Sequence, residues 1–335
     1  MPIVLGASQS ADSVLTEAGF AASARKRTDR ARSTRFIEIG LINNMPDAAL
    51  KSTERQFVEV LSAAAGNFSV RLHLFSLPEV PRSETGRSHL QAAYSQIGEL
   101  GKAKLDALIV TGAEPRTPVL DQEPYWDALA EVIDWAEHNT TSTIWSCLAA
   151  HAAVLHLDGV QRHELDEKRF GVFACDSVSD DPILSGAPSP QLVPHSRCNE
   201  LREDALVAHG YRVITRSPEA GVDMFVKQWR SLFVFFQGHP EYHLDSLSRE
   251  YRRDMGRFLR GEGESCPSIP QGYFDPRSEA LLQAFSARAQ IDRHADLLTN
   301  FPGHLRVRPI LIDSWRMSAI SVFRNWLSCL AERKA

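Results

Sequence analysis

The chain has 335 residues, 43% of them hydrophobic and 24% charged, as in a globular protein of one large or two modest domains. A net charge of −5 gives no reason to expect a nucleic acid or an anionic membrane as partner, and no apolar run approaches the roughly 20 residues of a membrane-spanning helix. Five scattered cysteines, with no C-x-x-C or H-E-x-x-H spacing and no signal peptide pattern, favour a reducing, cytoplasmic location and no metal site.

The first part of the chain alternates between predicted strands and helices. Residues 1–34 are rich in Ala, Ser and Arg and are predicted to be a poorly ordered leader. Thr53 and Gln56 have the spacing of a capping box ahead of a helical run. Strands are expected at 36–42, 69–75, 106–112 and 143–145, and further helices at 125–138 and directly after Cys147. This alternation predicts an α/β fold with a parallel sheet covered on both faces, whose ligands bind at the carboxyl ends of the strands.

The later segments indicate a mixed sheet and a longer C-terminal part. Strands are expected at 170–176 and 222–228, and the stretch at 232–242 is predicted to contain a continuous apolar strand that ends in Gly238 and His239. A helix follows, with an apolar stripe formed by Leu244, Leu247, Tyr251 and Phe258. Residues 261–310 match no clear pattern, and the chain ends in a helical run. Residues 35–335 are therefore expected to form a single α/β domain, elaborated over about 262–335.

Cys147 is the first candidate for chemistry. A free cysteine is usually a small buried hydrophobe, but this one lies where a strand meets a helix, as a nucleophile does on an elbow. The N-terminus of a helix lowers a thiol pKa and offers N–H groups to an oxyanion. An ordinary thiol is only slightly ionised at neutral pH, so a nucleophilic Cys147 needs a base nearby.

His239 is the candidate for that base. A histidine at a strand end can simply cap or pack, but Glu241 follows two residues later, where its side chain projects to the same side. Glu241 is then able to orient the imidazole and stabilise its charged form. His151 and His156 are nearer in sequence, but they fall on the predicted helix after Cys147 and are expected to point away from the turn.

Several motifs in order resemble one family. "LIVTGA", "TSTIWSC" and "GHPEY" after an apolar strand, together with the earlier "NNMPDAALKSTERQF", are similar to motifs of the homoserine O-succinyltransferase family. The likeness covers roughly residues 36–260 and returns weakly in "VFRNWL". It implies a flavodoxin-like fold related to class I glutamine amidotransferases, and a role in methionine biosynthesis.

The resemblance also implies a mechanism and substrate contacts. Cys147 takes an acyl group from an acyl-CoA, which is a co-substrate rather than a cofactor. His239, oriented by Glu241, then deprotonates the hydroxyl group of L-homoserine. Lys168 matches a position that meets a carboxylate, while Ser196 and Arg253 match positions that contact the amino-acid substrate. On the residues alone, Lys168 and Arg253 are also consistent with surface charge.

The loop after the third predicted strand departs from the family pattern. Arg116 occupies the position that influences the acyl group, and Glu114 replaces a proline. An arginine can pair bidentately with a succinyl carboxylate, a contact worth about 1.5–3 kcal/mol, which favours succinyl-CoA over acetyl-CoA. Glu114 can instead neutralise Arg116 or repel that carboxylate itself. The acceptor is open too, because L-serine is one methylene shorter than homoserine and such a difference is worth only about 1–3 kcal/mol.

Other classes of protein share parts of this pattern. A homoserine or serine O-acetyltransferase would use the same residues with acetyl-CoA. A glutamine amidotransferase-like hydrolase shares the Cys, His and Glu set, but it usually has glycine on both sides of the cysteine, where this chain has Trp145 and Ala149. A non-enzymatic module need not retain all three residues. A homodimer is expected by default.

Overall fold

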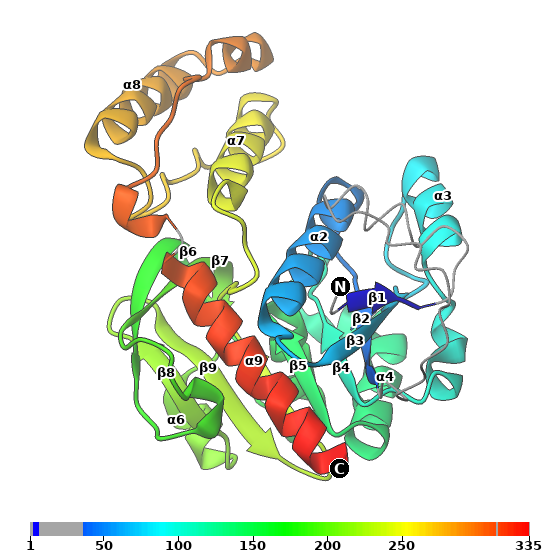
Figure 1. Cartoon of the computed structure of the whole chain (residues 1–335). Helices are drawn as coiled ribbons and strands as arrows, with labels where there is room; N and C mark the ends of the chain where they lie inside the picture. Colours follow the sequence, from blue (N-terminus) through cyan, green and yellow to red (C-terminus); the bar gives the residue numbers. More distant parts are fainter. Residues whose placement is uncertain (1–2, 7–35, 313, 335) are drawn as a thin grey trace, which may run out of the picture.

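The computed structural model describes residues 3–6, 36–312 and 314–334, which form one large sheet with helices on both faces (Figure 1). The strands are β1 (Ile3–Leu5), β2 (Phe36–Ile42), β3 (Ser69–Phe75), β4 (Ala107–Val110), β5 (Ser142–Ser146), β6 (His163–Ser177), β7 (Gln191–Glu200), β8 (Arg212–Ser217), β9 (Gly221–Gln228) and β10 (Leu232–Phe236). The helices are α2 (Asp47–Ala64), α3 (Glu84–Ala93), α4 (Trp126–Asn139), α5 (Leu148–Asp158), α6 (Glu203–Ala208), α7 (Ser246–Leu259), α8 (Pro276–Ile291) and α9 (Ser314–Lys334). None of these described helices is long and apolar enough to cross a lipid bilayer.

The sheet has a parallel half and an antiparallel half. Its strand order is β1-β3-β2-β4-β5-β10-β9-β8-β6-β7. The first six strands in that order pair in parallel, and each pair from β10 to β7 is antiparallel. The central order β3-β2-β4-β5-β10 is that of flavodoxin-like folds. The predicted α/β fold with a mostly parallel sheet is therefore confirmed.

Both faces of the parallel half are buried, which explains its near-continuous apolar strands. Alternate residues of β10 point to opposite faces: Val234 and Phe236 pack in the cluster with α2 and α9, while Phe233 and Phe235 pack in the cluster with α4 and α5. The C-terminal helix α9 lies across the sheet (Figure 1) and buries Trp326 almost completely. The last helix is therefore part of the main core, although it follows the elaborated segment.

A third apolar cluster joins α7 and α8, which lie together beyond the end of the sheet (Figure 1). Leu247, Tyr251 and Phe258 form the buried stripe of α7, as the sequence pattern indicated. Leu244, which was expected on the same stripe, lies before the helix begins and is exposed. The stripe anchors α7 against its neighbours and leaves its polar face free to line the site described below.

The structure corrects two of the predicted boundaries. Helix α2 begins at Asp47, well before the expected capping box, because Pro46 is extended and the residues after it are good helix formers. Gln56 instead lies inside the helix and donates to Ser246 Oγ at 3.0 Å. The predicted leader includes β1, whose Ile3 and Leu5 are buried and which pairs with β3; residues 7–34 of the leader lie outside the described residues.

Helix α8 lies within the segment that the sequence left unassigned. Asp275 caps it by accepting a hydrogen bond from the Ser278 N–H at 2.7 Å, and Pro276 occupies its first turn. These two residues are a recognisable helix-start signal. The signal was missed because the helix carries only a weak apolar stripe, with Leu282, Phe285 and Ala289 as its buried apolar residues.

Candidate active site

Cys147 lies on a strained turn between β5 and α5. Its backbone has φ 53° and ψ −114°, a conformation that is rare for any residue other than glycine. The Cys147 N–H donates to the carbonyl of Phe236 on the neighbouring strand at 2.7 Å, which ties the turn to β10. The thiol is partly exposed, and the helix begins at the next residue, as on a nucleophile elbow.

Gly112 allows the loop after β4 to approach this turn closely. A Cβ atom at this position would lie 2.8 Å from the Leu148 Cβ and 3.1 Å from the Leu148 backbone nitrogen. A larger residue would therefore push against the first turn of α5, which carries Cys147. The strand ends β4 and β5, which the sequence linked through Gly112 and Cys147, do meet at the same edge of the sheet.

His239 and Glu241 follow β10, the strand beside β5. The His239 Nδ1 lies 2.9 Å from Glu241 Oε1, and the two side chains are only 8% and 6% exposed, so this contact is shielded from water. Tyr242 stacks on the imidazole with ring centroids 4.2 Å apart. The His239 N–H donates to the Pro194 carbonyl at 2.8 Å, which fixes the backbone of the turn.

The charges around His239 favour its protonated form. Burial by itself lowers the pKa of His239, but the Cys147 side chain, through its charge and a hydrogen bond, and the Glu241 carboxylate raise that pKa well above its usual range. With Nδ1 occupied by Glu241, Nε2 remains for Cys147. The structure therefore brings Cys147, His239 and Glu241 together in an arrangement that suits a nucleophile, a base and an orienting acid.

The predicted substrate contacts line the same cavity as Cys147, which has a volume of about 230 Å³. Ser196, on β7, donates to Glu250 Oε2, and Tyr242 donates to the other oxygen of the same carboxylate. Arg253 is exposed on the polar face of α7, where it lines the cavity as its helical position indicated. Glu250 was not identified from the sequence. It lies on α7, one helical turn before Asp254, and the two carboxylates share one face of that helix.

Asp254 joins the two other predicted contacts. It accepts a hydrogen bond from Lys168 Nζ at 2.9 Å and from Arg253 Nε at 2.8 Å. Burial raises the pKa of Asp254, but Lys168 and Arg253 more than offset this and hold it below its usual range. In this arrangement both cationic side chains face the cavity while paired with an internal carboxylate.

The two residues of the predicted acyl-specificity loop have different positions. Glu114 lines the cavity and forms a bidentate ion pair with Arg257 of α7, at 2.6 and 3.1 Å. Arg116 is exposed and is not among the residues that line the cavity. Its backbone N–H donates to Glu123 Oε1 at 2.6 Å. The structure therefore does not bring the Arg116 side chain to Cys147.

Two other basic residues of the cavity were not identified from the sequence. Arg162 follows α5 and lines the cavity, and Arg197 on β7 does so with a nearly buried guanidinium. His151 also lines the cavity, contrary to the expectation that it points away from the turn. Burial lowers the pKa of His151 to about 3, so it is neutral, and it contacts Gln237 Oε1 at 3.1 Å. Both arginines lack a sequence signal, because only the fold brings them to Cys147.

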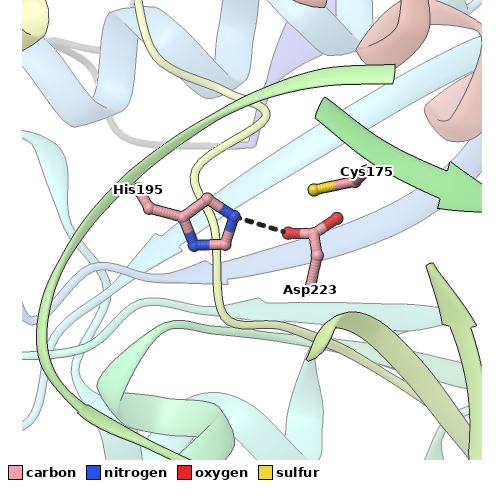
Figure 2. A group of neighbouring side chains, drawn as sticks. All are labelled: Cys175, His195 and Asp223. Atoms are coloured by element: carbon pink, nitrogen blue, oxygen red, sulfur yellow. Dashed lines mark ion pairs between the residues drawn. The ribbon is translucent and has the colours of Figure 1, made fainter. Parts of the chain in front are cut away.

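Cys175, His195 and Asp223 form a buried cluster beneath the His239 turn (Figure 2). Their ligand-type atoms lie within 4.8 Å of one another, and His195 Nε2 is 3.4 Å from Asp223 Oδ1. The Arg197 Nε–H points at His195 Nδ1 from 3.5 Å, so Nδ1 is the acceptor and the ring proton lies on Nε2, towards Asp223. His195 Nε2 and Asp223 Oδ1 form no hydrogen bond at this distance, and a protonated Nε2 has no lone pair to offer a cation.

The cluster packs directly against the residue before the base. A Cβ atom at Gly238 would lie 2.6 Å from Asp223 Oδ1 and 3.0 Å from His195 Nε2. The Asp223 carbonyl also accepts from the Gln237 N–H at 2.8 Å. The cluster therefore supports the backbone that carries His239.

Comparisons with known proteins place the chain in a family. The model of the family described as homoserine O-succinyltransferase matches residues 2–335. A homoserine O-succinyltransferase from Rhodopseudomonas palustris is 54% identical over 303 residues, covering 90% of this chain and 91% of the relative. One from Bradyrhizobium japonicum is 48% identical over 304 residues, covering 90% and 93%. Among solved structures, a glutamine amidotransferase from Methylobacillus flagellatus shares the fold, with a TM-score of 0.51 at 14% identity over 88% of this chain and 96% of that one.

Proposed function

Since this chain belongs to the homoserine O-succinyltransferase family, we propose that it transfers a succinyl group from succinyl-CoA to the hydroxyl of L-homoserine. The observation that carries the proposal is the buried His239–Glu241 pair beside Cys147 on its strained turn. This geometry suits two successive acyl transfers through a cysteine thioester, with no cofactor taking part.

In the first half of the reaction, the Cys147 thiolate attacks the thioester carbonyl of succinyl-CoA. Negative charge then develops on the carbonyl oxygen, near the first turn of α5, where backbone N–H groups have no carbonyl of their own helix to pair with. The tetrahedral intermediate collapses, the bond to the CoA sulfur breaks, and His239 donates its proton to the leaving thiolate. The products are free CoA and succinyl-Cys147, with His239 neutral.

In the second half, neutral His239 accepts the proton of the homoserine hydroxyl group as its oxygen attacks the thioester. Glu241 stabilises the imidazolium that forms, and Cys147 leaves as the thiolate, which restores the starting pair. Arg253 and Lys168 are suited to the carboxylate of homoserine, and Glu250 is suited to its ammonium group. Ser196 donates a hydrogen bond to Glu250 and so holds the Glu250 carboxylate in place.

The test is a matrix of two donors and two acceptors, together with trapping of the intermediate. Radiolabelled succinyl-CoA is expected to label wild-type protein at Cys147, and homoserine is expected to release the label as O-succinylhomoserine. Tenfold higher kcat/KM with acetyl-CoA, or with serine as acceptor, would replace the proposed substrate. Turnover by a Cys147→Ala variant would overturn the covalent route. The predicted homodimer is tested separately by light scattering of the full chain.

A further inference from the structure

The basic side chains around Cys147 differ in what they are paired with. Among the described residues, those lining the cavity are Arg162, Lys168, Arg197 and Arg253. Lys168 and Arg253 share the Asp254 carboxylate. The Arg197 guanidinium is buried and donates to the backbone carbonyls of Asn199 and Ala220. Three of these four groups therefore have their positive charge or their donors satisfied within the protein.

Arg162 differs from the other three. Its Nη2 donates to the Pro118 carbonyl at 2.8 Å, and no carboxylate of the described residues lies within the 4.0 Å of an ion pair. A guanidinium carries five N–H donors in a planar fork, so most of its capacity remains available. Burial lowers the pKa of Arg162, while Glu123, Glu164 and Cys147 act in the opposite direction without pairing with it. An anion that enters the cavity would find this cation partly desolvated and without a counter-ion.

The position of Arg162 suits a short chain attached to Cys147. Gly159, with φ +69°, ends α5, and the chain turns back so that Arg162 reaches the cavity beside the start of the same helix. Arg162 also borders a second cavity of about 200 Å³, which is lined by Val119, Leu120 and Leu155 and by the polar side chains of Gln161, Glu164 and Asn199. The two cavities share Arg162, His151 and Asn199 and therefore adjoin. An unpaired guanidinium thus lies between the largely apolar cavity that contains Cys147 and a more polar recess.

We propose that Arg162 binds the terminal carboxylate of the acyl group and so selects a dicarboxylic acyl donor over a neutral one. This inference rests on the proposed function, since it assigns the group that recognises the donor. In the succinyl-enzyme, two methylenes separate the thioester from the carboxylate, and the largely apolar lining of the Cys147 cavity accommodates them. The fork of Arg162 then meets the two carboxylate oxygens. An acetyl group makes neither contact and gains nothing from Arg162.

The Pro118 contact gives the neighbouring loop an indirect influence on this subsite. Pro118 belongs to the same loop as Glu114 and Arg116, and its carbonyl holds one edge of the Arg162 guanidinium. A change in that loop can therefore shift Arg162 without touching the acyl group. This route lets the loop affect donor choice while the exposed Arg116 side chain stays outside the cavity.

The test compares Arg162→Gln and Arg162→Lys with two donors. For Arg162→Gln, kcat/KM with succinyl-CoA is expected to fall about 10- to 150-fold, the range for one charge-assisted contact, while kcat/KM with acetyl-CoA stays within about threefold. Arg162→Lys is expected to recover part of the loss. Arg308→Gln is the matched control, because Arg308 also donates to a loop carbonyl, that of Phe274, but does not line the cavity. Equal losses with both donors would show a purely structural role and overturn the proposal.

A second readout needs no catalytic turnover. The alkylating reagents 4-iodobutyrate and 4-iodobutanamide attach a chain of succinyl length to a thiol, with and without a terminal charge. Peptide mass spectrometry at Cys147 gives the ratio of the two rates, from which any general change in thiol reactivity cancels. Wild-type protein is expected to favour the carboxylate reagent, and Arg162→Gln is expected to lose that preference. An unchanged ratio overturns the subsite, even if succinyl-CoA is the donor. A preference that depends on Arg162 in a protein that does not use succinyl-CoA overturns the proposed function alone.

Discussion

Replacing Glu241 with glutamine isolates the contribution of one charge to the base. The glutamine Oε1 can still accept from the His239 Nδ1–H, so the 2.9 Å contact is kept and only the negative charge is removed. Both side chains are nearly buried, so solvent screens the lost interaction little. A hydrogen bond to a charged group is worth about 1.5–3 kcal/mol, which corresponds to a pKa change of about 1–2 units or a rate factor of about 10–150.

The direction of the effect follows from the groups around His239. Glu241 is one of the two groups that raise the His239 pKa, so its neutral replacement lowers that pKa. Attack by homoserine needs neutral His239, and the acid limb of the pH profile of kcat/KM for homoserine is therefore expected to move to lower pH. The plateau is expected to fall about 10- to 150-fold, because the imidazolium formed during proton transfer has lost its partner.

The assay is the release of radiolabelled product from pre-formed succinyl-enzyme across the pH range. Glu59→Gln is the matched control: Glu59 also pairs with a histidine, His243, at 3.1 Å, but does not line the cavity. The reasoning is refuted if the acid limb of Glu241→Gln stays in place or moves to higher pH, or if Glu59→Gln shifts it equally.

Three further substitutions test the support around the site. Asp223→Asn is expected to weaken the pH dependence of stability. Burial raises the Asp223 pKa to about 6, so between about pH 4 and 6 the folded wild-type protein holds a proton that the unfolded chain has released, and wild-type stability falls as the pH rises. In urea unfolding, the difference in unfolding free energy between these two pH values is expected to be smaller in the variant by up to about 3 kcal/mol. Gly112→Ala is expected to lower kcat by tenfold or more in steady-state assays with unchanged far-UV circular dichroism, since its Cβ meets Leu148; full activity would show that the turn tolerates displacement. Phe323→Ala, in the middle of α9, is expected to cost about 3–5 kcal/mol in urea unfolding, and a loss below 1 kcal/mol would show that α9 lies outside the core.

The sequence predicted those parts of the fold in which local pattern and global order agree. Apolar runs ending in Gly112, Cys147 and His239 are strands β4, β5 and β10, and parallel neighbours have their carboxyl ends at one edge. Cys147 and His239 could therefore be proposed as site residues from strand ends, and Glu241 from its spacing to His239, and the structure brings the three together.

Predictions failed where tertiary contacts overrode a local signal. Thr53 and Gln56 have the spacing of a helix start but are buried within α2, because Gln56 reaches Ser246. β1 is three residues long and is a strand only because it pairs with β3, so nothing in its own sequence marks it. A short edge strand can be told from a loop, and a capping sequence inside a helix from a true helix start, only once the tertiary partners are known.

The polar residues of the site likewise could not all be predicted, because their partners come from distant parts of the chain. Lys168 and Arg253 were assigned from the family resemblance. Asp254, the carboxylate that pairs with both, lies on a helix face whose sequence is also typical of an ordinary protein surface. Arg162 has no motif, and its role depends on where the chain turns after α5. Arg116 has the sequence position expected to govern the acyl group, yet it is exposed and is not among the residues that line the cavity.

Strand β10 pairs with a parallel neighbour on one side and an antiparallel neighbour on the other. Cys147 and the loop after β4 come from segments on the parallel side, and Arg162 directly precedes β6, at the passage to the antiparallel side. Lys168 on β6 and Ser196 on β7 come from the antiparallel side, with His239 at the boundary between them. The residues proposed for the donor thus precede those proposed for the acceptor along the chain, and β6, which begins directly after Arg162 and carries Lys168, joins the two sets.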